Sequence, residues 1–160
     1  MVCRVTESFS LPIVPRYAEV DQQGVVFNGH YLTWFDEAST AFFDHIGLPF
    51  TEFNALGLDV QVVHAELDYL MPVRWRDAVR VAAGVESIGT TSFTLCFEVL
   101  RRGEEREVSA VRGRNVYVVV STDDWAKRAL PSSLRDALTS VAGQGQNGTG
   151  DVIEGGTVGA

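Results

Sequence analysis

Apolar side chains recur at helical spacing through one segment early in the chain. Between residues 30 and 46 the aromatic and aliphatic positions follow a helical period, and Gly47-Leu48-Pro49 ends the pattern. Asn28 or Gly29 can serve as the N-cap. The pattern predicts a helix so apolar that other parts of the protein must surround it.

Alternating apolar and polar positions dominate the second half of the chain. Four long stretches are rich in Val, Phe and Tyr, and turn-forming residues separate them. These predicted strands cover residues 60–70, 78–88, 92–101 and 107–120. Residues 16–20 read as the end of an earlier strand, residues 52–56 as a helical turn and residues 132–142 as a short helix. We therefore expect an α+β fold in which a curved antiparallel sheet wraps around one long central helix.

The composition divides the chain into a domain and a tail. With 160 residues, 46% of them hydrophobic, the chain is long enough for one domain with a real core, which we assign to residues 1–142. Residues 143–160 contain seven glycines and no aromatic residue, which predicts a disordered tail. The tail matches G-x-G-x-x-G, but no strand leads into the match and no helix follows, so we do not expect a dinucleotide site.

Charge and cysteine content exclude several classes of function. A net charge of −8 argues against a nucleic-acid partner, although a few local arginines can still hold a phosphorylated molecule such as coenzyme A. No signal peptide or membrane span is visible, so we expect a cytoplasmic protein without a membrane partner. Three scattered histidines and two distant cysteines form no metal-ligand pattern, and we expect no metal and a buried free thiol at Cys96.

A carboxylate stands just before the predicted helix. Asp21 begins a turn with Gly24, and the helix that follows presents unpaired N–H groups and a positive dipole end at its start. Such donors suit a carbonyl oxygen that becomes an oxyanion, and a nearby carboxylate can act as nucleophile or as general base. The alternative is that Asp21 only caps its own turn, since Asp is a common turn residue.

These residues carry a family resemblance. Residues 21–31 (Asp-Gln-Gln-Gly-Val-Val-Phe-Asn-Gly-His-Tyr), followed by Trp-Phe-Asp-Glu-Ala at 34–38, look like the signature of hotdog-fold acyl-CoA thioesterases of the 4-hydroxybenzoyl-CoA thioesterase family. Residues 65–77 and Ser92-Phe93 resemble that family's later strands and its Pro-x-Arg turn, so the likeness covers about residues 10–122. It implies a hotdog fold and hydrolysis of an acyl-CoA thioester, with coenzyme A as part of the substrate and no further cofactor.

The resemblance also assigns roles to single residues. It makes Asp21 the catalytic carboxylate and places backbone N–H donors, those of Asn28 and Gly29 among them, against the thioester oxygen. Asp36 falls where some relatives touch the acyl group, although it can equally be an exposed helix carboxylate. Glu37 occupies a position at which other hotdog subclasses keep a carboxylate.

Further substrate contacts are expected from aromatic residues and histidines. Trp34 and neighbouring aromatic residues would line an apolar pocket, and Tyr31 would pack beside it. His30 departs from the usual pattern of the family and would contact substrate or a neighbouring subunit, or simply be satisfied at the helix start. His64 would face the site, or be hydrogen-bonded in its strand.

Coenzyme A phosphates require cations. Arg74 and Arg76 in the Pro-x-Arg turn, and Arg112 and Arg114 on one face of the last strand, are the candidates, with a solvated surface as the alternative for each. The long last strand, residues 107–120, needs a partner or protection at its edge. We expect a homodimer or homotetramer with sites at the subunit interface.

Two other functions stay open at this level. A non-catalytic acyl-CoA-binding module would keep its affinity without Asp21. A hotdog hydratase or dehydratase needs a positioned histidine, and neither His30 nor His64 falls in the Asp-x-Asn-Pro-x-His pattern that those enzymes resemble. No G-x-S-x-G motif is present, and the sequence does not specify the acyl group.

Overall fold

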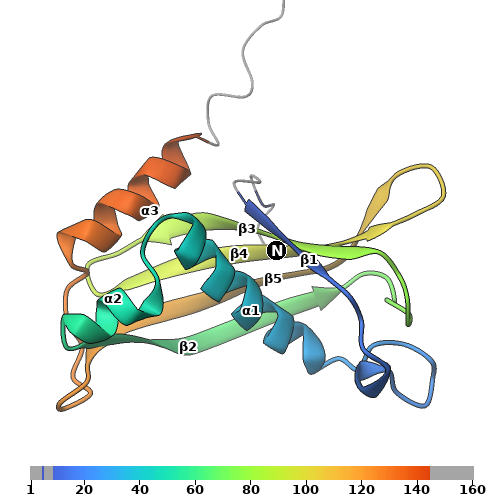
Figure 1. Cartoon of the computed structure of the whole chain (residues 1–160), viewed down its shortest axis with the longest axis horizontal. Helices are drawn as coiled ribbons and strands as arrows, with labels where there is room; N and C mark the ends of the chain where they lie inside the picture. The colour runs from blue at the N-terminus through green and yellow to red at the C-terminus, as the bar shows by residue number, and fades with distance from the viewer. Residues whose placement is uncertain (1–4, 6–8, 145–160) are drawn as a thin grey trace, which may run out of the picture.

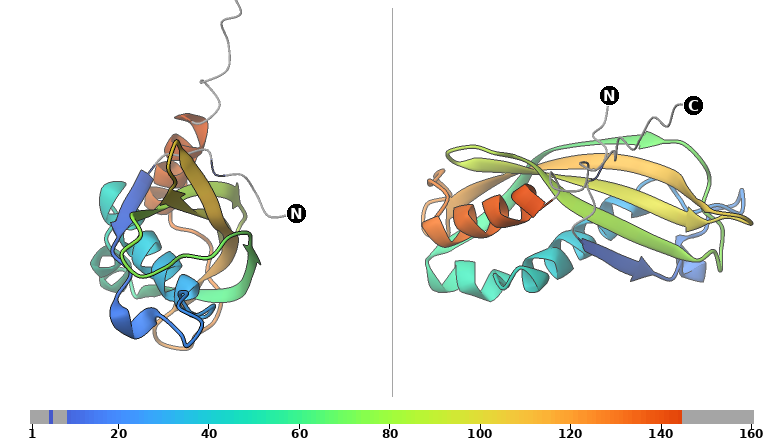
Figure 2. Two further views of the ribbon diagram at one scale, coloured as in Figure 1. Left: turned by 90° about the vertical axis from the view of Figure 1, so that its right-hand side faces the viewer. Right: turned by 90° about the horizontal axis from the view of Figure 1, so that it is seen from above.

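A curved antiparallel sheet wraps around one long helix in the computed structural model, which describes residue 5 and residues 9–144. The elements are β1 (Phe9–Ile13), a 3-10 turn η1 (Tyr17–Glu19), α1 (His30–His45), α2 (Phe50–Ala55), β2 (Leu58–Tyr69), β3 (Val79–Ile88), β4 (Ser92–Arg102), β5 (Glu107–Ser121) and α3 (Ser132–Gln144). The strand order is β1-β3-β4-β5-β2 (Figure 1). Viewed end-on, the sheet curves around α1 (Figure 2). The predicted α+β architecture, with its long helix and four long strands, is therefore confirmed.

The apolar side of α1 lies flat against the inner face of the sheet. Phe35, Ala38 and Phe42 are fully buried, and the Phe35 ring stacks on Phe97 of β4 with centroids 4.7 Å apart. Gly113 of β5 permits this close approach, because a β-carbon built there would lie 2.9 Å from Phe35 Cζ. Inward-facing residues of β5 are thus the odd-numbered ones around position 113, which leaves the even-numbered ones on the outer face.

The N-terminal part of the fold differs from expectation. Residues 16–20 were expected to end a strand, but residues 17–19 form the 3-10 turn η1, because the Glu19 N–H bonds back to the Arg16 carbonyl. The first strand is instead β1, which pairs antiparallel with β3 and places Ile13 opposite Val79. Pro12 obscures this strand in the sequence, and its position on an edge strand explains how it is tolerated.

The last helix continues two residues beyond its predicted end. α3 runs to Gln144, so Gly143 belongs to the helix rather than to the tail. Leu134 and Leu138 of α3 are fully buried. Residues 145–160, the remainder of the predicted tail, lie outside the described residues.

The exposed sheet edge is not the one expected. β5 was expected to need a partner, but it lies between β4 and β2 and is paired on both sides. Within the described sheet, the outer strands are β1 and β2. Cys96 of β4 is buried as expected, but its sulfur is disulfide-bonded rather than a free thiol.

Candidate active site

Asp21 sits in a tight turn between η1 and α1. Its Oδ1 accepts hydrogen bonds from the N–H groups of Gln23, at 2.8 Å, and Val25, at 3.5 Å. Its own N–H donates to the Val25 carbonyl at 2.9 Å, and Gly24 takes a positive φ of 80° to close the turn. Asp21 therefore caps its own turn, as the alternative interpretation predicts, but this role occupies only one of its two carboxylate oxygens. The other oxygen, Oδ2, accepts no hydrogen bond from the described residues.

A buried carboxylate that the sequence analysis missed fixes this turn. Glu19 is only 4% exposed, and its oxygens accept hydrogen bonds from the backbone N–H of Arg16 at 2.7 Å and the indole N–H of Trp34 at 3.1 Å. The Arg16 guanidinium lies 3.0 Å from Oε1. Burial raises the pKa of Glu19, but these hydrogen bonds together hold the pKa below its ordinary value. The available sequence signal was the i,i+3 spacing of Arg16 and Glu19, and nothing local pointed to Trp34.

The start of α1 offers two free backbone donors. The Phe27 N–H is used, because it donates to the Glu19 carbonyl at 2.9 Å, and the His30 N–H donates to the Phe27 carbonyl at 3.0 Å. The N–H groups of Asn28 and Gly29 have no acceptor within the described part of the chain. Gly29 is the N-cap and provides no side-chain cap. Of the backbone N–H groups at this helix start, those of Asn28 and Gly29 are therefore the ones that a substrate oxygen can use.

Asn28 borders a hollow between α1 and the end of β2, which we call the entrance hollow. It measures about 280 Å³ and is lined by Val25, Val26, Asn28, Tyr31, Tyr69, Leu70, Met71 and Pro72. The Tyr69 hydroxyl donates to the Asn28 carbonyl at 3.1 Å and so joins the end of β2 to the segment that leads into α1. The end of β2 and the start of α1 both lie in the right half of Figure 1. Phe27 is 49% exposed and packs edge-on against His30.

Tyr31 lines the entrance hollow and also lies near the Asp21 carboxylate. The side chain is buried, and burial raises the pKa of its hydroxyl while a backbone hydrogen bond from Val73 opposes the rise. The Asp21 carboxylate lies close enough to raise that pKa further by its charge. The structure therefore brings Asp21, Asn28 and Tyr31 to one place.

A second hollow continues along the same seam between α1 and β2, and we call it the Asp36 hollow. It measures about 380 Å³ and is lined by Leu32, Thr33, Asp36, Val62, Ala65 and Asn115. Asp36 is exposed at its rim. Asp36, the residue expected to touch the acyl group, therefore borders a hollow that lies further along α1 than the entrance hollow.

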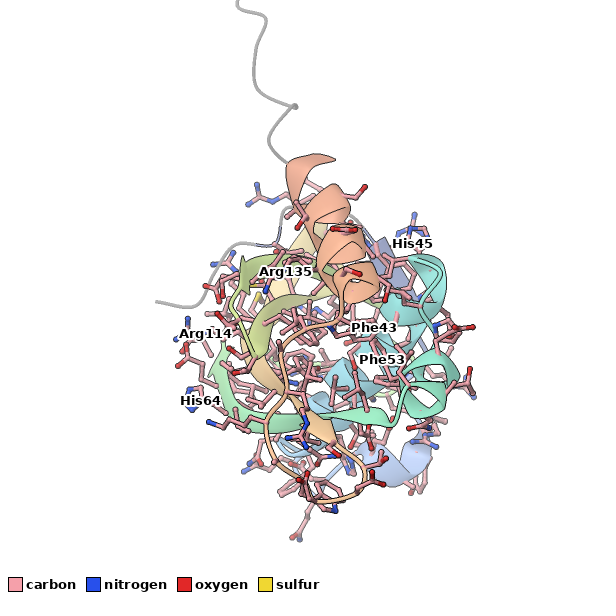
Figure 3. The ribbon with its side chains drawn as sticks, turned by 90° about the vertical axis from the view of Figure 1, so that its left-hand side faces the viewer. Phe43, His45, Phe53, His64, Arg114 and Arg135 are labelled. Carbon is pink, nitrogen blue, oxygen red and sulfur yellow. The ribbon has the colours of Figure 1, made fainter. Side chains whose placement is uncertain are left out.

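Several predicted substrate contacts lie elsewhere within this chain. Trp34 is buried in the core with 1% exposure, so it supports Glu19 instead of lining a pocket. His64 and Arg114 lie on the outer face of the sheet, away from the Phe43 and Phe53 side of the molecule (Figure 3). His64 lies 3.4 Å from Glu66, and Arg114 Nε lies 2.7 Å from the same carboxylate.

The four candidate arginines divide into two groups. Arg112 and Arg114 share the outer face as predicted, but Arg112 is paired with Glu98 at 3.1 Å and Arg114 also meets Glu86. Arg74 and Arg76 are exposed and form no ion pair with a described residue. A backbone bridge between Val25 and Arg74 places the Pro-x-Arg turn beside the Asp21 turn.

The Pro-x-Arg turn has an unusual local geometry. Arg76 takes a positive φ of 68°, which is uncommon for a residue with a side chain. Its guanidinium lies 4.3 Å from the ring centre of Trp75, and Trp75 in turn meets Tyr17 edge-on with centroids 5.7 Å apart. All three side chains are exposed, so this end of the molecule presents aromatic surface beside positive charge.

The other features of the described residues provide no second candidate for the active site. A larger hollow of about 470 Å³ opens near the turn between β4 and β5, but none of the predicted catalytic residues lines it. The described chain contains no cluster of three His, Cys, Asp or Glu side chains arranged to hold a metal ion. None of its helices is long and apolar enough to cross a membrane.

A curved sheet around a central helix, with a carboxylate beside free N–H groups at the helix start, defines a domain of the hotdog class. The model of the thioesterase-like superfamily matches residues 15–138. The chain therefore belongs to the thioesterase-like superfamily, a class of thioester hydrolases.

Individual relatives agree with this placement. The chain is 31% identical over 98 residues to a 1,4-dihydroxy-2-naphthoyl-CoA hydrolase of Prochlorococcus marinus (strain NATL1A), a match that covers 56% of this chain and 65% of the relative. The matches to curated relatives cover between 51% and 72% of the relatives' own lengths.

Solved structures share the fold. A hypothetical protein from Thermus thermophilus superposes with a TM-score of 0.75 at 25% identity, over 82% of this chain and 98% of its own. A DHNA-CoA thioesterase from Staphylococcus aureus superposes with a TM-score of 0.78 at 22% identity, over 88% of this chain and 94% of its own. The hotdog fold expected from the resemblance is thereby confirmed.

Proposed function

We propose that the protein hydrolyses acyl-CoA thioesters to the free acid and coenzyme A. The observation that carries the proposal is that Val25 of the Asp21 turn and Asn28, which has a free N–H group, line one hollow, with the free N–H group of Gly29 next to Asn28 in the chain. The family membership and the names of the curated relatives support it. A pure binding module would have no need of a carboxylate held beside two unpaired donors.

In the proposed reaction, the thioester oxygen lies against the N–H groups of Asn28 and Gly29. The free oxygen Oδ2 of Asp21 either attacks the carbonyl carbon or takes a proton from an attacking water. Negative charge then develops on the carbonyl oxygen, and the two donors stabilise it. The C–S bond breaks as the carbonyl re-forms, and the thiolate leaves without an acid catalyst because a thiol pKa is only about 8.5. When Asp21 attacks the carbon itself, the acyl group is left as an anhydride on Asp21, and water hydrolyses that anhydride to release the acid and restore the carboxylate. When Asp21 acts as a base, the attacking water supplies the oxygen of the acid directly, and its proton passes to Asp21.

The coenzyme A part of the substrate would extend from the entrance hollow toward the Pro-x-Arg turn. Arg74 and Arg76 are the candidate phosphate partners there, because neither is paired with an acidic side chain within the described residues. Arg112 and Arg114 are less suited within one chain, since Glu98, Glu66 and Glu86 already neutralise them. His30, whose ring packs against Phe27 at the start of α1, is a further proposed substrate contact.

We further propose that the active form is a homodimer or homotetramer whose contact includes β2. Val62 and Val63 on this outer strand are 47% and 59% exposed, and Leu32 of α1 is 41% exposed beside the same seam. An exposed apolar edge strand is normally covered. Both hollows open along this seam, so a partner there would also complete the site.

The test is thiol release from a panel of short aliphatic, long aliphatic and aromatic acyl-CoAs. Wild type should hydrolyse part of the panel, and Asp21→Asn should lower kcat by two or more orders of magnitude while still binding the thioester. Asp44→Asn is the matched control, because it changes an exposed carboxylate at the far end of α1 and should retain full activity. Failure of wild type to release thiol from any acyl-CoA would overturn the proposal, and so would full activity of Asp21→Asn.

A further inference from the structure

Arg101, near the end of β4, lies against the Pro-x-Arg turn instead of extending into solvent. Only 17% of its side chain is exposed, and its Nη1 donates a hydrogen bond to the Pro72 carbonyl at 2.9 Å. The same nitrogen lies 3.9 Å from a carboxylate oxygen of Asp77. The Arg101 Nε is buried and has no hydrogen-bond partner among the described residues. Burial of an incompletely satisfied guanidinium is unfavourable, so its presence here requires an explanation.

The carbonyl that Arg101 binds belongs to a peptide group that reaches the candidate active site. The Pro72–Val73 peptide bond is trans, so the Pro72 carbonyl and the Val73 N–H point in opposite directions. The carbonyl meets Arg101, and the Val73 N–H donates a hydrogen bond to the Tyr31 hydroxyl. Because the peptide group is planar and rigid, fixing its carbonyl also fixes the direction of its N–H. Arg101 and Tyr31 therefore hold one peptide plane from its two sides.

Val73 also connects this peptide to the Asp21 turn. Val73 is fully buried, and its carbonyl accepts a hydrogen bond from the Val26 N–H at 2.8 Å. Val25, one residue earlier, accepts the Asp21 N–H at its carbonyl and donates its own N–H to the Asp21 carboxylate. Val25 and Val26 both line the entrance hollow. A displacement of Val73 would therefore move the Asp21 carboxylate together with one wall of this hollow.

The charges around Tyr31 also place Arg101 near the site. Burial is the main cause that raises the pKa of Tyr31, and the hydrogen bond from Val73 opposes it. The Arg101 charge also lowers this pKa, whereas the Asp21 charge raises it. Such effects weaken with distance, so Arg101 and Asp21 both lie near the same hydroxyl. Arg101 does not line the entrance hollow itself, which separates it from groups that would touch the substrate.

We infer that Arg101 is a positioning residue for thioester hydrolysis, which acts through the Pro72–Val73 peptide on Tyr31 and on the Asp21 turn. This inference rests on the proposed function. Arg101 keeps the Asp21 carboxylate at the place where it can meet the thioester carbon or the attacking water. A shift of a catalytic group by about 1 Å can lower the rate by about 100-fold, whereas binding of the substrate elsewhere along the site is retained.

The first experiment measures thiol release by Arg101→Met, which keeps the length of the side chain and removes its donors. With the acyl-CoA that wild type hydrolyses fastest, kcat should fall by about 10–100-fold while KM stays within about threefold. Arg101→Lys keeps a donor for the Pro72 carbonyl, so its kcat should return to within about fivefold of wild type. Arg106→Met, in the exposed turn between β4 and β5, is the matched control and should keep the wild-type kcat. Urea titration establishes that each variant is folded under assay conditions.

A double-mutant cycle separates positioning from a general loss of folded protein. If Arg101 acts by placing Asp21, adding Arg101→Met to Asp21→Asn should lower the residual kcat by less than about twofold. A general loss of folded protein would instead lower kcat by the same factor in both backgrounds. The Kd of the thioester should be the same for Asp21→Asn with and without Arg101→Met. If Arg101→Met does not fold, Arg101→Gln, which stays polar but is shorter, takes its place in the cycle.

Hydrogen exchange at the Val26 amide gives a measurement that does not depend on hydrolysis. Arg101→Met should make this amide exchange at least about tenfold faster, while amides in the middle of β4 keep their wild-type protection. A wild-type kcat in folded Arg101→Met, or an equal loss in both backgrounds of the cycle, would overturn the inference and leave the proposed function intact. Absence of thiol release from wild type would overturn the proposed function instead, and the exchange at Val26 would then decide alone whether Arg101 supports this segment.

Discussion

The indole N–H of Trp34 donates a hydrogen bond across 3.1 Å to the buried carboxylate of Glu19. This bond joins the second turn of α1 to the segment that leads into Asp21. The Glu19 backbone continues the connection, because its carbonyl accepts the Phe27 N–H at the other end of the loop. Glu19 therefore holds both ends of the segment that carries the candidate catalytic groups.

Removing the indole donor should destabilise the protein. Trp34→Phe keeps most of the buried ring but takes one hydrogen bond from a charged acceptor, which typically costs about 1.5–3 kcal/mol. The free energy of unfolding from urea titration should fall by that amount. Trp125→Phe, at a position that is 62% exposed, is the control and should change it by less than about 0.5 kcal/mol. An equal loss in both variants would contradict the role given to the Glu19 bond.

Glu19 should also contribute to loss of stability in acid. Its folded pKa lies below the ordinary value of 4.5, so the stabilisation is complete above that pH and is lost as the pH falls through the lower folded pKa. We expect the urea midpoint to fall as the pH is lowered below about 4.5, and to fall less steeply in Glu19→Gln. Glu105→Gln in the exposed turn between β4 and β5 should keep the wild-type slope. Parallel curves for wild type and Glu19→Gln would refute this assignment.

The sequence predicted the parts of the fold that follow from periodicity. The long strands and α1 were found because each carries a strong period over many residues, as in the run from Tyr31 to Phe42. β1 was missed because five residues interrupted by Pro12 carry no clear period, and its pairing with β3 is a contact between distant parts of the chain. The edge strand could not be identified either, since the order of strands in a sheet depends on contacts that periodicity does not record.

The sequence predicted those parts of the candidate site whose residues are neighbours in the chain, and it missed those that depend on contacts between distant elements. Asp21 and the helix start are neighbours in the sequence, so their meeting could be anticipated. Glu19 acts through Trp34 on another element, and nothing in the sequence around Glu19 indicates this contact. Trp34 was assigned to a pocket because an aromatic residue on an apolar helix face looks the same whether it lines a cavity or fills the core.

The contact between α1 and β5 should not tolerate a larger residue at position 113. A β-carbon at Gly113 would lie 2.9 Å from both the Glu66 carbonyl oxygen and Phe35 Cζ, so Gly113→Ala must displace the helix or the sheet. We expect a loss of about 1–3 kcal/mol in the free energy of unfolding. Gly143→Ala is the opposite case, because this helical position has open space around it and alanine favours helices. Its free energy of unfolding should rise by up to about 1 kcal/mol, and a gain from Gly113→Ala would contradict the packing described.

The backbone N–H of Gly29 can be removed without removing a side chain. Gly29 has a φ of −70°, which proline shares, so Gly29→Pro deletes the donor while it keeps the local φ. If this N–H stabilises the oxyanion, kcat should fall by about 10²–10³-fold. Gly29→Ala keeps the N–H and meets only the exposed Phe27 ring at 3.2 Å, so it should stay within a few-fold of wild type. Circular dichroism establishes that both variants are folded, and a folded Gly29→Pro with wild-type kcat would remove Gly29 from the oxyanion site.

The edge of β2 provides a test of assembly that is separate from the chemistry. Val63 lies at the irregularity in the pairing of β2 with β5 and is 59% exposed on the outer strand. A lysine there would place a charge in any contact through this edge, which is how natural edge strands avoid pairing. We expect Val63→Lys to lower the mass measured by light scattering toward the 17.5 kDa of one chain. Val14→Lys, at a position that is 81% exposed and lies outside β2, should retain the wild-type mass. Because the entrance and Asp36 hollows open on the same seam, thioester hydrolysis should fall together with the mass in Val63→Lys, whereas a monomer with full activity would show that the site needs no partner.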